Sequence, residues 1–395
     1  MTGIDAVNDS TVVIRLESSF APFLLMLTMP YGFIVAREAV QHYGADVFQH
    51  PVGTGPYRLD HWKPDEELVL TRHAGYRQQS GGTIETVTVT FGRDVKTEFM
   101  EFTRGNYDVT MAVAQGFENA VFDSTGAVTQ EYQKYRSVAL PALTTEYYGI
   151  LVDPTLDAAT RAPLAQSVQV RQALNYAIDR EAIIRFVLRG QAVAARGVLP
   201  PGVAGFDPGR SGYTYDVAKA KELLAAAGYP DGHGLPTLTL QLGPSEQTAS
   251  VAEAVQQQWK QIGVQVELKQ VDFPQHLDMI RSGKLPLWRT QWVADYCDAE
   301  NFLALFASRN FSPGGPNTTH FSDPGFDALY ARCLDASLTE NVREGLFRSM
   351  DSLVVASSPW VFLYYPRTVR LLQPEIKTFT CDPLGRFAVA DIVKL

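Results

Sequence analysis

Residues 291–306 read QWVADYCDAENFLALF, a mostly apolar run that encloses one carboxylate, Asp295, between two aromatic residues. An unpaired charge in apolar surroundings is energetically costly, so aspartate is rarely buried without a partner. We therefore expect Asp295 to meet a cation, with Trp292 and Tyr296 forming the walls of the site. That cation is either a side chain of the protein, such as Arg289, or a charged group on a ligand.

Length and composition indicate a soluble globular protein with more than one domain. A chain of 395 residues is too long for one ordinary core, and its length predicts two or three domains. The apolar fraction of 46% and the charged fraction of 19% are typical of soluble proteins. The net charge of -9 and the lack of any basic run argue against a nucleic-acid partner, which clustered Lys and Arg would bind.

The residue types that most often carry chemistry are scattered along the sequence. Three widely spaced cysteines without a CxxC pair favour isolated thiols over disulfides or a zinc site. The histidines show no i, i+4 pair, and the motifs HExxH, GxSxG and GxxxxGK(S/T) do not occur. The triplet GTG at 53–55 lacks a third glycine at the spacing that cradles a phosphate, so it predicts a plain turn. We therefore expect no enzyme, no resident metal and no cofactor.

Hydrophobic periodicity predicts strands alternating with helices, and hence an α/β protein. The apolar spacing over 168–190 predicts one helix that ends at Gly190, and Asp216 and Gly228 mark the two ends of another. Strands at 237–243 and 264–271 enclose a helix capped by Ser245, which predicts a βαβ unit. Further strands are predicted at 11–16, within 51–152 and from 361, and further helices near 323–336 and 339–355.

Five blocks of the sequence carry a resemblance to one family of binding proteins. They are PVGTGPYRLDHWKPDEELVLTRHAGY (51–76), VQVRQALNYAIDREAII (168–184), AKELLAAAGYPDGHGLPTLTL (220–240), WVADYCDAENFLALF (292–306) and NTTHFSDPGFDALY (317–330). Their order and spacing are similar to those of the periplasmic solute-binding proteins of ABC transporters, in the peptide/nickel class (family 5). That class includes oligopeptide- and dipeptide-binding proteins, and the resemblance covers nearly the whole chain.

The resemblance implies an α/β fold of the periplasmic-binding-protein type, a class II, peptide-binding clamp of two lobes. Residues 51–150 and 364–395 are expected to form lobe I, and residues 151–363 are expected to form lobe II. The sequence lacks the signal and the opening strands that the family normally carries. We therefore expect residues 1–50 to be the remnant of an extra N-terminal subdomain, and the clamp to be N-terminally incomplete.

The resemblance also implies ligand contacts for particular residues. In oligopeptide-binding members, a W-x-A-D-Y segment supplies the aspartate that pairs with the α-ammonium group of the peptide, and that position falls on Asp295. Trp292 and Arg289 match positions that line the peptide or meet its carboxylate. Tyr147 and Thr145 fall on a strand next to the hinge that contributes main-chain and aromatic contacts.

Each of these residues also has a purely structural interpretation. Asp295 can pair with an internal cation, and Arg289 can belong to an internal or surface ion pair. Trp292 can be a core residue, and Tyr147 can be a half-buried sheet residue because aromatic side chains favour strands. Asp298 fits an N-cap for a helix that begins near Ala299.

The leading functional hypothesis is a periplasmic or cell-surface protein that binds peptides and delivers them to the permease subunits of an ABC importer. The alternatives within the fold are binding of a nickel complex, heme or a sugar, or the ligand-sensing domain of a regulator. No helix-turn-helix segment accompanies the acidic composition, which argues against a DNA-binding regulator. We expect a monomer with a peptide ligand, a membrane permease as partner and no nucleic acid.

Overall fold

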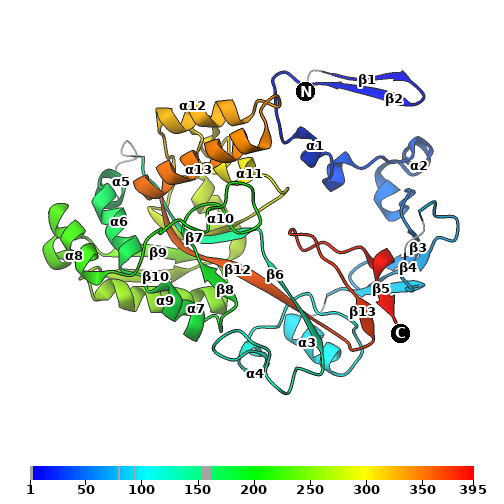
Figure 1. The fold of residues 1–395 in the computed structure, drawn as a ribbon, viewed down its shortest axis with the longest axis horizontal. Coiled ribbons are helices and arrows are strands. Elements are labelled where there is room, and N and C mark those ends of the chain that lie inside the picture. Colours follow the sequence, from blue (N-terminus) through cyan, green and yellow to red (C-terminus); the bar gives the residue numbers. More distant parts are fainter. Residues whose placement is uncertain (1–2, 79–80, 93, 154–161) are drawn as a thin grey trace. The chain divides into compact units, whose positions relative to one another are not determined.

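The computed structural model describes residues 3–78, 81–92, 94–153 and 162–395, which divide into two compact units (Figure 1). Unit 1 contains Met1–Thr28, Ala142–Leu188 and Ala192–Pro366, and unit 2 contains Met29–Pro141, Arg189–Gln191 and Arg367–Leu395. The lobe boundaries that the resemblance implies stay a prediction. Within the described residues, no helix combines the length and the apolar character needed to cross a membrane.

Unit 1 is built on a mixed sheet with the strand order β10–β9–β11–β7–β12, and β8 also pairs with β12. The strands are β7 (Thr144–Ile150), β8 (Ala192–Ala194), β9 (Leu238–Leu242), β10 (Val266–Gln270), β11 (Leu287–Val293) and β12 (Trp360–Leu372). Strands β9 and β10 are parallel and are joined by helix α9 (Glu246–Lys260), which confirms the predicted βαβ unit. Every residue of β7 is buried, which is typical of a strand with neighbours on both sides.

Capping side chains set the boundaries of several helices in unit 1. The carboxylate of Asp216 accepts a 2.8 Å hydrogen bond from the backbone N–H of Lys219, and the helix begins where the sequence predicts. Ser245 caps α9 through the backbone N–H of Thr248, also as predicted. The other helices are α5 (Ala162–Gln166), α6 (Val168–Tyr176), α7 (Arg180–Phe186), α8 (Val217–Ala226), α10 (Phe273–Arg281), α11 (Glu300–Leu303), α12 (Pro324–Cys333) and α13 (Glu340–Ser357).

The prediction of a single helix over 168–190 is wrong. Helix α6 ends at Tyr176, and α7 begins only after Asp179, whose carboxylate accepts a 2.9 Å hydrogen bond from the N–H of Ala182. Aspartate favours such a cap over an interior helical position, so it interrupts the apolar pattern. Gly190 lies beyond the end of α7 and does not terminate it.

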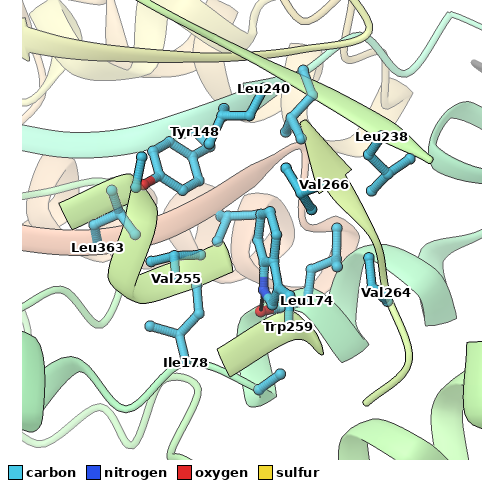
Figure 2. Packing of buried hydrophobic residues seen from close by; sticks show 14 of the residues in the cluster. Tyr148, Leu174, Ile178, Leu238, Leu240, Val255, Trp259, Val264, Val266 and Leu363 are labelled. Carbon is cyan, nitrogen blue, oxygen red and sulfur yellow. Dashed lines mark hydrogen bonds between the residues drawn. The ribbon is translucent and has the colours of Figure 1, made fainter. Parts of the chain in front are cut away.

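A large apolar core of unit 1 surrounds the indole of Trp259 on α9 (Figure 2). This ring is fully buried among aliphatic side chains such as Val255 and Val266. Its N–H donates a 2.9 Å hydrogen bond to the backbone oxygen of Leu174 on α6. The indole therefore links a helix that follows β9 to a helix from a distant part of the sequence without leaving a polar atom unpaired.

Unit 2 has its own sheets and core. Its antiparallel three-stranded sheet has the order β3 (Tyr57–Lys63), β4 (Glu67–Arg72) and β5 (Thr86–Thr90). The second part of β12 pairs with β6 (Arg136–Pro141), and β13 (Ile376–Thr378) pairs with β14 (Val393–Lys394). The α-helices of this unit are α2 (Arg37–Tyr43), α3 (Val95–Thr103) and α4 (Glu118–Val121). Phe99 and Phe102 on α3 pack with Tyr132, Tyr135 and Leu371 in an apolar cluster.

The first residues form a hairpin of β1 (Gly3–Asn8) and β2 (Thr11–Arg15), which confirms the predicted strand at 11–16. Most side chains of this hairpin are exposed. The segment after it, which includes α1 (Phe23–Met26), is joined to the rest of unit 1 by hydrogen bonds. The N–H of Ala21 donates to the oxygen of Leu334 at 2.9 Å, and the N–H of Ala336 donates to the hydroxyl of Ser19 at 2.8 Å.

Candidate functional site

The six residues that the sequence predicts for a ligand site all lie in unit 1, on β7, on β11 and directly after β11. Strands β7 and β11 are antiparallel neighbours, and their register places Trp292 opposite Thr145. The same register places Thr290 opposite Tyr147. The fold therefore brings together residues that are about 150 positions apart in the sequence, and it places Asp295 just beyond the end of β11.

Asp295 is exposed, so its carboxylate does not lie in the apolar surroundings that the sequence around it suggests. Burial alternates along this segment, because Ala294 and Tyr296 are buried on either side of Asp295. The chain bends after the end of β11, so the apolar neighbours face the core while the carboxylate faces solvent. Among the residues that the structure describes, no lysine, arginine or histidine forms an ion pair with Asp295.

A buried amide, that of Asn301 on α11, holds Asp295 and Trp292 together. Its Oδ1 accepts hydrogen bonds from the indole N–H of Trp292 at 3.0 Å and from the backbone N–H of Asp295 at 3.1 Å. Its Nδ2 donates to Oδ2 of Asp295 at 3.3 Å. Asn301 is not among the site residues that the sequence predicts, although a lone amide at the start of the apolar run NFLALF is a signal for it.

Trp292 is partly exposed, so the core interpretation of this residue is wrong. Its indole N–H is fixed by Asn301. Trp292 and Asp295 therefore form one surface feature, an aromatic ring beside a carboxylate, that a single amide orients.

Arg289 is engaged by an internal carboxylate rather than by Asp295. Its Nη2 lies 2.6 Å from Oε1 and 2.7 Å from Oε2 of Glu146, and its Nε lies 3.1 Å from Oε2. Glu146 is buried on β7, and burial raises the pKa of its carboxyl while the charge of Arg289 opposes that shift. The structure thus shows the internal ion pair that was left open for Arg289, and the alternative pairing of Asp295 with Arg289 is wrong.

The backbone of Arg289 has a second partner, the buried imidazole of His276 on α10. Nε2 of His276 donates to the oxygen of Arg289 at 2.8 Å, and Nδ1 accepts from the amide of Gln241 at 3.1 Å. This pattern fits a neutral ring, and burial lowers the pKa of His276. His276 and Gln241 therefore fix β11 at the position of Arg289, a role that the sequence predicts for neither residue.

Thr145 and Tyr147 point into unit 1, so neither side chain lines a solvent-accessible wall. Tyr147 is 3% exposed, and its ring stacks on Trp360 with centroids 3.3 Å apart and an interplanar angle of 9°. Burial raises the pKa of its hydroxyl well above the usual value. The hydroxyl of Thr145 donates a 2.7 Å hydrogen bond to the oxygen of Val198.

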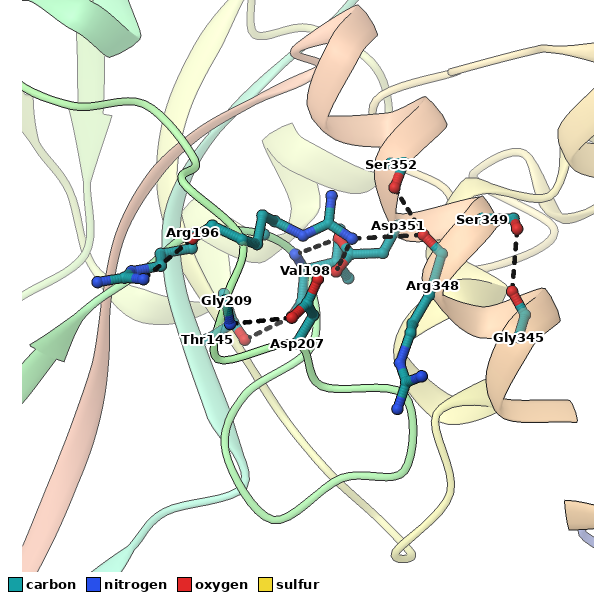
Figure 3. Close-up of polar contacts among 12 residues, drawn as sticks. Thr145, Arg196, Val198, Asp207, Gly209, Gly345, Arg348, Ser349, Asp351 and Ser352 are labelled. Atoms are coloured by element: carbon teal, nitrogen blue, oxygen red, sulfur yellow. Dashed lines mark hydrogen bonds and ion pairs between the residues drawn. The ribbon is translucent and has the colours of Figure 1, made fainter. Parts of the chain in front are cut away.

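Through Val198, the strand β7 is connected to helix α13 (Figure 3). The N–H of Val198 donates to Oδ1 of Asp351 at 2.8 Å, and Nη2 of Arg210 lies 3.4 Å from Oδ2 of the same carboxylate. Asp351 is 2% exposed, and burial raises its pKa to about 6 against the opposing effect of Arg210. Thr145 therefore serves as an attachment point for the segment around Val198.

Tyr296 also turns inward, so the expectation that it walls the site beside Asp295 is wrong. Its hydroxyl donates a 2.5 Å hydrogen bond to Oε2 of the buried Glu300, whose other oxygen accepts from the hydroxyl of Tyr330. Burial raises the pKa of Tyr296 and of Tyr330. These contacts hold the segment that carries Asp295 from its inner side.

Asp298 lies one residue before Ala299, the N-cap of α11, so the prediction that Asp298 is the N-cap is wrong. Its Oδ1 still accepts a 2.9 Å hydrogen bond from the N–H of Glu300, the first residue of the helix. Asp298 also forms a two-point ion pair with Arg343 on α13, with distances of 2.9 and 3.0 Å. The segment from Asp295 to Asn301 is thus fixed on both sides of the carboxylate. An anchored loop of this kind holds Asp295 in place without a ligand.

The arrangement can bind a small cation. The carboxylate of Asp295 is exposed and forms no ion pair with any residue that the structure describes. Together with the partly exposed indole of Trp292, it offers an acceptor and an aromatic ring to the same group. Within the described part of the chain, no group of three or more His, Cys, Asp or Glu side chains is arranged to hold a metal ion.

Residues 1–313 match the family model described as bacterial extracellular solute-binding proteins, family 5 Middle. The glutathione-binding protein GsiB of Salmonella typhimurium is 29% identical over 394 residues, which cover 98% of this chain and 73% of GsiB. GsiB of Escherichia coli O157:H7 is 28% identical over 395 residues, with the same shares of the two chains.

Solved structures share the fold. The periplasmic binding protein DppA from Helicobacter pylori, solved with the peptide STSA, has a TM-score of 0.76 at 22% identity and matches 100% of this chain and 74% of its own. HbpA2 from Haemophilus parasuis has a TM-score of 0.82 at 23% identity, over 100% of this chain and 75% of its own. The predicted fold class, an α/β protein of the periplasmic peptide-binding type, is therefore confirmed.

The family assignment fixes the general role of the chain. Members of family 5 are transport binding proteins rather than enzymes, and they serve as the substrate-binding components of ABC importers. The family match covers more than half of the sequence, so the assignment does not depend on any one motif. The chain belongs to the bacterial extracellular solute-binding proteins of family 5.

Proposed function

We propose that this protein binds peptides through their free α-ammonium group and delivers them to the permease of an ABC importer. The observation that carries the proposal is the exposed carboxylate of Asp295, which has no internal cation among the described residues and lies beside the indole of Trp292. The protein acts outside the cytoplasm as a monomer, and it uses neither a cofactor nor a nucleic acid.

The chemistry of an ammonium group supports this assignment. A hydrogen bond between a charged donor and a charged acceptor is shorter and stronger than one between neutral groups, with about 1.5–3 kcal/mol for bonds to charged groups. A cation near the face of Trp292 adds about 0.5–1 kcal/mol at a partly exposed position. Asp295 and Trp292 together therefore provide enough interaction energy to distinguish a charged amine from a neutral amide.

The ligands of similar proteins share this group. GsiB is named a glutathione-binding protein, and the DppA structure contains the peptide STSA. A dipeptide-binding protein from Pseudoalteromonas sp. SM9913, with a TM-score of 0.77 at 22% identity, was solved with Met-Leu. Glutathione, STSA and Met-Leu all carry an α-ammonium group, which supports a shared requirement for an anionic acceptor.

A matched pair of peptides tests the proposal. The affinity of the protein for a tripeptide library with free N-termini is compared, by ligand-observed NMR and calorimetry, with its affinity for the same library after N-acetylation. We expect acetylation to weaken binding by about tenfold or more, because it removes the charge that Asp295 attracts. Equal binding of both libraries, or preferred binding of a nickel complex, heme or a sugar, contradicts the proposal.

The same experiment on Asp295→Ala links the preference to this residue. We expect this variant to bind both libraries with the weak affinity that the wild-type protein has for the acetylated one. Asp278→Ala is the matched control, because Asp278 is an exposed carboxylate on α10 of the same unit. A full preference for free N-termini in Asp295→Ala contradicts the assignment of the ammonium to Asp295.

A further inference from the structure

Asn301 has hydrogen-bond contacts that a residue serving only the core would not need. Asn301 is 6% exposed, between the fully buried Phe302 and the buried Glu300 on α11. Its amide also contacts the hydroxyl of the buried Tyr296, but its hydrogen bonds to Trp292 and Asp295 reach the surface. A buried amide costs free energy unless it is paired, so this contact set has to be maintained in the folded protein.

The partners of the amide define its orientation. Oδ1 of Asn301 faces two N–H donors, on the Trp292 ring and on the Asp295 backbone, and Nδ2 faces a carboxylate oxygen. The flipped amide would oppose donors to donors and an oxygen to an oxygen, so the network assigns one orientation. In this orientation the amide occupies Oδ2 of Asp295, and Oδ1 of Asp295 remains for another group.

The position of Asn301 is itself fixed by contacts that no ligand provides. The preceding residue, Glu300, accepts hydrogen bonds from the hydroxyls of Tyr296 and Tyr330. Asp298 joins the start of α11 to Arg343 on α13. These contacts fix the position of Asn301, and the hydrogen bond from its amide in turn restrains the carboxylate of Asp295.

We infer that Asn301 is a positioning residue of the ligand site. Its side-chain amide sets the orientation of the Asp295 carboxylate and of the Trp292 indole relative to each other. This inference rests on the proposed role of Asp295 as the ammonium acceptor. Without the amide, the carboxylate rotates freely and the indole N–H loses its acceptor. The preference for a free N-terminus then falls although Asp295 is still present, because an unoriented acceptor binds with a larger entropic cost.

The test is the ratio of affinities for the free and the N-acetylated tripeptide libraries in Asn301→Leu, a substitution of similar size that removes the hydrogen bonds of the amide to Trp292 and Asp295. We expect the ratio to fall about tenfold toward one, with the affinity for the acetylated library unchanged. We also expect the indole N–H resonance of Trp292, assigned with Trp292→Phe, to shift. A purely structural role for Asn301 lowers both affinities equally and leaves the ratio unchanged, which overturns the inference.

Two comparisons keep the test decisive. Asn301→Ser is more easily tolerated at a buried polar position, and its short hydroxyl cannot reach both partners, so we expect the same fall in the ratio. A wild-type protein without any preference for free N-termini refutes the proposed function itself. A wild-type preference that persists in both Asn301→Leu and Asn301→Ser refutes only the positioning role.

Discussion

Replacing Arg289 by Met leaves the carboxylate of Glu146 buried without its cation. The two side chains are only 19% and 6% exposed, and three close N···O contacts join them. Removing one partner of a buried ion pair costs about 3–5 kcal/mol, because the remaining charge is desolvated without compensation. We expect Arg289→Met to lower the free energy of unfolding at pH 7 by about that amount.

The loss of unfolding free energy in Arg289→Met is expected to increase with pH. Burial already raises the pKa of Glu146, and loss of the charge of Arg289 raises it further. A carboxyl with a raised pKa in the folded state contributes stability through its neutral form below its usual pKa and loses that stability as pH rises. The destabilisation by Arg289→Met is therefore expected to be smaller near pH 4 than at pH 7.

Urea unfolding measured by tryptophan fluorescence provides the assay, because every tryptophan except Trp62 lies in unit 1. The control is the double variant Glu146→Leu/Arg289→Met, which replaces the pair with apolar side chains and should unfold within about 1 kcal/mol of the wild-type protein. A loss below about 1 kcal/mol in Arg289→Met at pH 7, or an equal loss at both pH values, refutes this reasoning.

Two further predictions concern the support of unit 1. Burial raises the pKa of Asp351 to about 6, so its neutral form stabilises the fold at low pH and that stability is lost as pH rises through this value. Asp351→Asn should flatten this part of a curve of unfolding free energy against pH, and an unchanged slope contradicts the prediction. Trp259→Phe removes buried ring volume and the hydrogen bond to Leu174, so it should destabilise the protein by about 2–4 kcal/mol in urea unfolding. A loss below about 1 kcal/mol would show that the core closes around the smaller ring.

Local signals in the sequence predict the elements that depend on local physics. The start of α8 and that of α9 follow from the capping residues Asp216 and Ser245, which act within one helical turn. The break between α6 and α7 depends on a similar local cap, Asp179, but the apolar periodicity continues across it and obscures it. Periodicity alone therefore joins two helices that the structure separates.

The partners of the site residues depend on contacts between distant segments, which periodicity does not encode. The ion pair of Arg289 with Glu146 requires the register of β11 on β7, and a shift by one residue would point Arg289 to the other face of the sheet. The exposure of Asp295 depends on how Ala294 and Tyr296 enter the core. The resemblance points to this segment, and only the fold shows which of its side chains face solvent.

The most direct test of the ammonium-binding role of Asp295 is a crystal structure of this protein with a bound tripeptide that has a free N-terminus. We predict that the α-ammonium nitrogen lies about 2.7–2.9 Å from a carboxylate oxygen of Asp295, with Nδ2 of Asn301 still donating to the other oxygen. A bound peptide whose ammonium group contacts a different acceptor, with Asp295 facing solvent, contradicts the account.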